Sequence, residues 1–132
     1  MKTQKQFILD TLLPYKEDPT TCGYEVSSCL YLTGDGKKCA VGKHLITGEW
    51  QNHTGDYNGL IDTYNAEDIF TQEALDQKLP SRVWRAMQFY HDNLALGQNR
   101  TKEHIVASDS FNRHITEIEN ALKIELTELR FN

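Results

Sequence analysis

The longest periodic pattern in the sequence covers residues 109 to 130. Apolar residues recur there every three or four positions, with glutamate and lysine between them. This spacing is typical of one face of an α-helix, so we predict a long C-terminal helix that begins at Ser108-Asp109-Ser110. Its apolar seam consists of Phe111, Ile115, Ile118, Leu122, Leu126 and Leu129. Such a seam packs either against its own chain or against a second copy or a partner protein, and both alternatives stay open.

Two short apolar runs flank a turn signal nearer the N-terminus. The runs are Cys29-Leu-Tyr-Leu-Thr and Lys38-Cys-Ala-Val, and Gly34-Asp35-Gly36 lies between them. Glycine and aspartate accept the positive φ angles that a tight hairpin turn requires. We therefore predict a β-hairpin at this place in the chain.

Shorter helical patterns account for most of the remaining chain. Three more helices are predicted, over 3–13 with Pro14 as the stop, over 65–79, and over 81–97. Together these elements predict an α+β fold, in which a small antiparallel β-hairpin or sheet packs with about four helices. We expect a single domain over 1–132, with a compact α+β part over 1–108 and the long C-terminal helix over 109–131.

Composition disfavours several classes of function. The 132 residues carry a formal net charge of −5, from 19 acidic and 14 basic side chains. An acidic chain lacks the counterion release that drives most nucleic-acid binding, so a nucleic-acid partner is not expected. No apolar run approaches the roughly 18 residues of a membrane helix. Three cysteines without a secretory leader predict free thiols and a cytoplasmic location.

Cysteine and histidine are the residues with the most obvious chemistry. Cys22, Cys29, Cys39 and His44 have the right atoms for a zinc site, but none of them forms the close pair that structural zinc sites use. A Cys29–Cys39 disulfide is geometrically conceivable across a hairpin. Buried thiols that act as small hydrophobic groups are the preferred interpretation. We therefore predict no metal and no cofactor.

A thiol enzyme would need a base, and His91 followed by Asp92 is the candidate pair. Adjacent helical residues point about 100° apart, so Asp92 is expected to be badly placed to orient the imidazole. His91 also lies on the apolar stripe of its helix, with Trp84, Met87 and Leu94, which predicts a buried histidine. We predict no catalytic residue.

The segment 48–64 is rich in glycine, asparagine, aspartate and threonine, and it is the longest irregular stretch predicted. Long loops in compact domains often serve function. Trp50 and Tyr57 are candidate anchors for binding, together with Asp56.

Several of these motifs together resemble a family of small uncharacterised phage, prophage and bacterial proteins. The resemblance rests on Cys29-Leu-Tyr31, Asp35-Gly36, Cys39-Ala40-Val41-Gly42 and the later His91-Asp92, and it covers about residues 5–95. It implies that Cys29, Cys39, His91 and Asp92 lie close together in space. These four residues are the candidate ligands if a metal is bound. It also implies a mobile-element origin, where small acidic proteins often inhibit host or defence proteins.

We therefore expect a non-enzymatic protein-interaction or regulatory module, such as a phage-encoded inhibitor of a host or defence protein in the host cytoplasm. Its partner would be another protein or a second copy of the chain. Two alternatives from other classes stay open: a metal- or thiol-dependent enzyme, and a protein that sequesters a small ligand such as a nucleotide.

Overall fold

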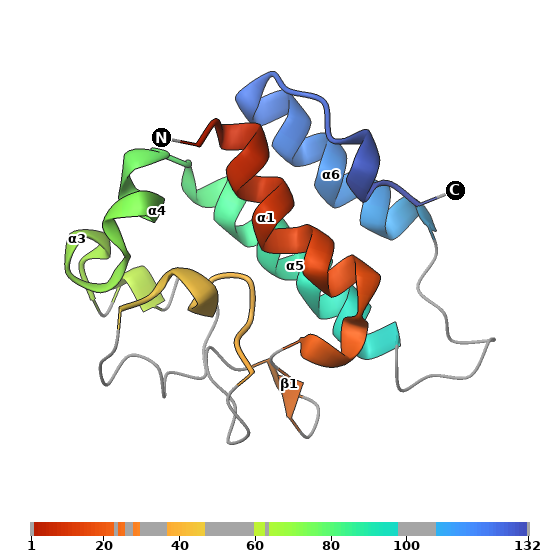
Figure 1. Cartoon of the computed structure of the whole chain (residues 1–132), viewed down its shortest axis with the longest axis horizontal. Helices are drawn as coiled ribbons and strands as arrows, with labels where there is room; N and C mark the ends of the chain where they lie inside the picture. The colour runs from red at the N-terminus through yellow and green to blue at the C-terminus, as the bar shows by residue number, and fades with distance from the viewer. Residues whose placement is uncertain are drawn as a thin grey trace.

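A computed structural model describes residues 2–22, 24–25, 28–29, 37–46, 60–62, 64–97 and 108–131. This part of the chain is mostly helical. The long helices α1, α5 and α6 lie together, and the short helices α3 and α4 lie at one end (Figure 1). In chain order the elements are α1 (Gln4–Glu17), η1 (Pro19–Thr21), β1 (Tyr24–Glu25), β2 (Ser28–Cys29), η2 (Gly42–His44), α3 (Ala66–Ile69), α4 (Gln72–Asp76), α5 (Ser81–Gly97), α6 (Ser108–Leu122) and η5 (Thr127–Leu129).

The predicted α+β class is therefore wrong. In the described residues, extended pairing is limited to two residues each of β1 and β2 and a single bridge between Leu45 and Phe70. The expected second hairpin strand, Lys38-Cys-Ala-Val, instead leads into η2. The Cys39 carbonyl accepts the Lys43 amide at 3.0 Å, so the chain makes a helical turn here and does not continue as a strand. The turn Gly34-Asp35-Gly36 lies outside the described residues.

Helix α1 continues past the residue that was expected to end it. Pro14 lies inside the helix, and the Asp18 amide still donates to the Pro14 carbonyl at 3.0 Å. Pro14 has no N–H to donate to the Asp10 carbonyl, and Asp10 lies on the exposed side of the helix. Tyr15, which is almost fully buried, anchors the additional turn.

The predicted helix over 65–79 is divided into α3 and α4 by an extended residue, Phe70. The strand-like segment after η2 causes the division: the Ile46 amide donates to the Ile69 carbonyl, and the Thr71 amide donates to the His44 carbonyl, both at 2.8 Å. Thr71 then begins α4 by accepting the Ala74 amide on its hydroxyl. A contact between segments distant in sequence thus outweighs the local helical pattern.

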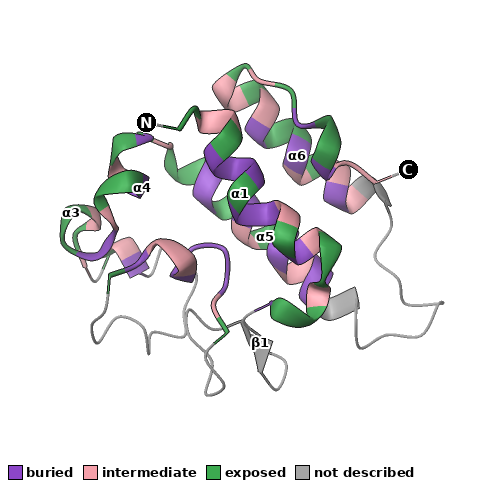
Figure 2. Cartoon of the chain, in the orientation of Figure 1, coloured by how far each residue is buried: buried purple, intermediate pink, exposed green. Residues whose placement is uncertain are grey.

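Helix α5 agrees with its prediction, and it packs along α6. Asn93 donates to Ser110 at 3.1 Å, and the Phe89 ring lies 5.5 Å from the His114 ring, centroid to centroid. Residue numbers rise on one helix as they fall on the other, so the two helices are antiparallel. Buried and exposed residues alternate along α1 and α6 (Figure 2), as expected for helices that each present one face to the core.

The C-terminal helix is shorter than predicted. It ends at Leu122, where Lys123 takes a left-handed conformation with φ of 57° and the Ile124 amide donates to the Glu119 carbonyl at 3.2 Å. This six-to-one bond is a Schellman ending, which usually uses glycine. The Glu119 carboxylate also accepts the Leu126 amide at 2.7 Å and pairs with Arg130, and these bonds hold the reversed chain against α6.

Most residues of the apolar seam pack into the core of their own chain. Leu126 and Leu129 come from the returning segment rather than from the helix, and the Leu129 carbonyl accepts a hydrogen bond from the buried Tyr90 hydroxyl at 2.8 Å. Leu122 is only partly buried. The other seam residues, Phe111, Ile115, Ile118, Leu126 and Leu129, are buried in the core. The long helix proposed as a dimer surface therefore does not exist as one continuous face.

Within the described ranges, no helix combines the length and apolar character needed to span a bilayer.

Candidate functional site

The predicted cysteine and histidine set lies partly together in the core. Cys22 and Cys39 are buried free thiols, and the Cys22 thiol contacts the His91 carbonyl at 3.8 Å. Because Cys39 is free, the Cys29–Cys39 disulfide is not formed. Tyr15 stacks edge-on against the fully buried His91, with ring centroids 4.7 Å apart. The side chain of Cys29 lies outside the described residues.

Asp92 contacts the imidazole that it was expected to miss. His91 Nδ1 lies 2.9 Å from Asp92 Oδ1, because Nδ1 is close to the backbone and the carboxylate reaches back to it. The same oxygen accepts the Gln88 amide at 2.8 Å, and Gln88 Oε1 accepts the Val41 amide at 3.3 Å. This chain of bonds fastens the Cys39-Ala-Val-Gly turn to α5. It therefore has a structural use that requires no catalysis.

The buried thiols are poor nucleophiles. Burial raises the pKa of both Cys22 and Cys39 to about 12, and the Asp92 carboxylate adds to the rise. A thiolate is the reactive form, so neither sulfur is activated at neutral pH. Among the residues that the structure describes, no three His, Cys, Asp or Glu side chains gather as metal ligands would. The His44 side chain contacts Thr11 and Phe7.

Trp50, Asp56 and Tyr57, the predicted binding residues of the 48–64 loop, lie outside the described residues. Their role stays a prediction.

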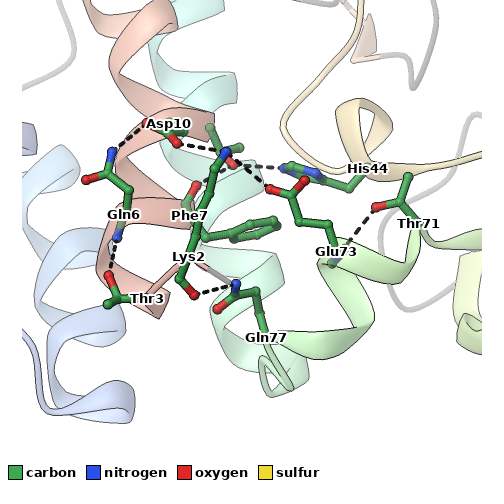
Figure 3. A network of polar contacts seen from close by, with 11 residues as sticks. Lys2, Thr3, Gln6, Phe7, Asp10, His44, Thr71, Glu73 and Gln77 are labelled. Carbon is green, nitrogen blue, oxygen red and sulfur yellow. Dashed lines mark hydrogen bonds and ion pairs between the residues drawn. The ribbon is translucent and has the colours of Figure 1, made fainter.

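A polar network joins the start of α1 to α4 (Figure 3). Lys2 pairs with Asp10 at 2.9 Å and with Glu73 at 3.2 Å. Gln77 donates to the Lys2 carbonyl at 3.0 Å. A cleft of about 370 Å³ lies beside this network, and His44 is part of its wall. The charged side chains of this Lys2 cleft largely pair with each other, which leaves few polar groups available to bind a small ligand.

Thr11 and His44 have the spacing of a nucleophile and its base, since Thr11 Oγ1 lies 2.8 Å from His44 Nε2. The hydroxyl proton is already used, because Thr11 donates to the Phe7 carbonyl at 2.8 Å. His44 must therefore donate from Nε2, so it cannot accept the proton of that hydroxyl. Burial also lowers the pKa of His44 to about 4. The pair is structural.

The exposed surface over α5 and α6 holds a different cluster, which we call the arginine groove. It is a hollow of about 290 Å³ lined by Arg82, Arg85, Ala86, Phe89, Arg113, His114 and Glu117. Three of the five arginines in the acidic chain gather here. Within the described part of the chain, no side chain or carbonyl accepts a hydrogen bond from any of the three.

An exposed aromatic ring lies at one end of the arginine groove. Phe89 is 49% exposed, and its ring lies against His114. Burial and the neighbouring Arg113 lower the pKa of His114. The imidazole is therefore neutral at pH 7, and it lies tilted against the Phe89 ring as an uncharged group.

The arginine groove was not predicted from sequence, because its basic residues look scattered along the chain. One signal was present. Arg85 and Phe89 lie three and seven positions after Arg82, and this spacing places the three residues on one face of α5. Arg113 joins them only through the packing of α6.

Comparisons of the chain with protein families, with curated proteins and with solved structures gave no match.

Proposed function

We propose that this chain is a non-enzymatic interaction module that regulates a partner protein by binding it through the arginine groove. The observation that carries the proposal is the group of three exposed arginines without internal acceptors in the described residues, next to an exposed phenylalanine. Arginine and aromatic residues are enriched where proteins bind each other.

The rigid position of the groove supports this function. Its residues lie on α5 and α6, the two longest helices, whose facing sides are buried against each other. Side chains held on such a scaffold lose less conformational freedom on binding than side chains on loops. The two alternative functions have weaker support, since the described thiols are not activated and the charges of the Lys2 cleft are paired.

Charge reversal tests the proposal. Wild-type protein and an Arg82→Glu/Arg85→Glu variant are immobilised, and the proteins retained from the cell of origin are identified, purified and titrated. Both substitutions lie in the first turns of α5, where glutamate suits the helix dipole, so the fold should persist. Resemblance to phage proteins makes host and defence enzymes the first partners to examine.

A matched variant controls for net charge. Lys78→Glu/Lys123→Glu makes the same charge change at two exposed lysines that do not line the groove. We expect the purified partner to bind wild type and this control alike, and to bind the groove variant at least tenfold more weakly. Equal binding by both variants would remove the groove from the interface and contradict the proposed function.

A further inference from the structure

We propose that the occupant of the arginine groove is an acidic segment of the partner protein, with a large apolar side chain close to its carboxylates. This inference rests on the proposed function and specifies its chemistry. It follows from the charge, the shape and the order of the groove residues.

The charges favour carboxylates. A guanidinium binds a carboxylate with two parallel N–H···O bonds, and Arg82 and Arg85 stand about one helical turn apart on α5. Arg113 supplies a third positive charge from α6. Exposed arginines that find no acceptor in the described part of the chain are available for such bonds without breaking an existing pair.

The apolar end of the groove favours a bulky side chain beside the carboxylates. The rings of Phe89 and the neutral His114 lie against each other, with ring planes 40° apart and centroids 5.5 Å apart, and Phe89 is half exposed. An aromatic or large aliphatic side chain would cover the exposed part of Phe89 and gain hydrophobic stabilisation. A hollow of about 290 Å³ is large enough for one such side chain.

Spacing along α5 sets the order of the occupant's residues. Phe89 lies seven positions after Arg82, which corresponds to a rise of about 10.5 Å at 1.5 Å per residue. An extended peptide covers that length in about three residues at 3.3 Å each. Two acidic residues, a spacer and an apolar residue therefore match the groove.

Nucleic acid is the weaker occupant. Glu117 also lies in the wall of the groove, and the many charges of a polyanion meet more repulsion there than the two carboxylates of a short segment do. The net charge of −5 disfavours the long-range approach of a polyanion, whereas a short segment that meets only the three arginines is less affected.

Peptide titration tests this inference with the full chain. The probe is a fluorescent peptide, Gly-Glu-Glu-Gly-Phe-Gly, with the reversed order, a Gln-for-Glu form and an Ala-for-Phe form as comparisons. Binding is followed by anisotropy at low salt. We expect the peptide with one of the two Glu–Phe orders to bind the wild-type protein. Its affinity should fall about tenfold or more when the protein carries Arg85→Gln or Phe89→Ala. The Gln-for-Glu and Ala-for-Phe peptides should bind the wild-type protein at least tenfold more weakly. The Lys78→Gln control should bind as wild type does.

Three outcomes of the peptide titration would overturn the inference. They are no binding of either Glu–Phe peptide, binding that Arg85→Gln and Phe89→Ala leave unchanged, and tighter binding of a ten-nucleotide thymidine strand than of the peptides. A molecular mass that doubles with concentration, and falls to that of a monomer in Arg85→Glu, would instead assign the groove to a second copy. A purified partner that depends on the groove but is not displaced by the peptides overturns this chemistry and leaves the proposed function standing.

Discussion

His44 should make the protein less stable in mild acid. Burial lowers the pKa of its imidazole to about 4, from 6.5 in the unfolded chain, and the neighbouring Lys43 cation adds to the lowering. Between these two pKa values the unfolded state binds a proton that the folded state excludes. The free energy of unfolding therefore rises with pH in this window, and the contribution is lost as pH falls from about 6.5 toward 4.

The size of the effect follows from the two pKa values. At pH 7.5 both states are essentially neutral, and at pH 5.0 the unfolded imidazole is almost fully charged while the folded one is not. The difference amounts to about 2 kcal/mol of stability lost between pH 7.5 and 5.0. For a domain of this size that is a large fraction of the total.

Urea unfolding of wild type and His44→Gln at both pH values measures this loss. Glutamine can donate to Thr11 in place of Nε2 but does not titrate, so the wild-type protein should lose about 2 kcal/mol more than the variant. His114→Gln serves as a control that keeps most of the loss. Equal losses in wild type and His44→Gln, or an NMR titration of His44 near its ordinary pKa, would refute the reasoning.

Other predictions follow from burial. In a Cys29→Ser variant, Cys22 and Cys39 should resist a thiol reagent at pH 8 until urea unfolds the protein, because their pKa values are raised and the sulfurs are covered; rapid labelling of the native variant would contradict this. Leu126→Ala should cost about 2–5 kcal/mol of unfolding free energy, as for a fully buried leucine, and Leu122→Ala clearly less; equal costs in urea unfolding would show that the returning segment is not packed as described.

Local patterns predicted several elements of this chain well. The apolar stripe of Trp84, Met87, His91 and Leu94 indicated α5 and its buried histidine, and both are observed. The periodicity from Phe111 onward indicated α6. In each case the signal and its cause are local, since 3.6-residue spacing brings the apolar side chains to one face.

The errors arose where a distant contact decided the local conformation. Lys123 has no sequence signal for a helix end, yet it takes the left-handed conformation where the Glu119 side chain holds the returning segment. Leu126 lies in that segment and has a helical spacing from Leu122 only by coincidence. The turn after Cys39 likewise packs on α5 through Gln88 instead of pairing as a strand.

The sequence alone thus determined which helices have a buried face, because hydrophobic spacing acts within each segment. Only the tertiary structure decided where the chain reverses and which exposed charges meet. Arg82 and Arg85 are close in sequence, but Arg113 reaches them only because α6 packs antiparallel on α5. A surface built from two helices depends on how those helices pack, and the pattern of either helix alone does not contain that information.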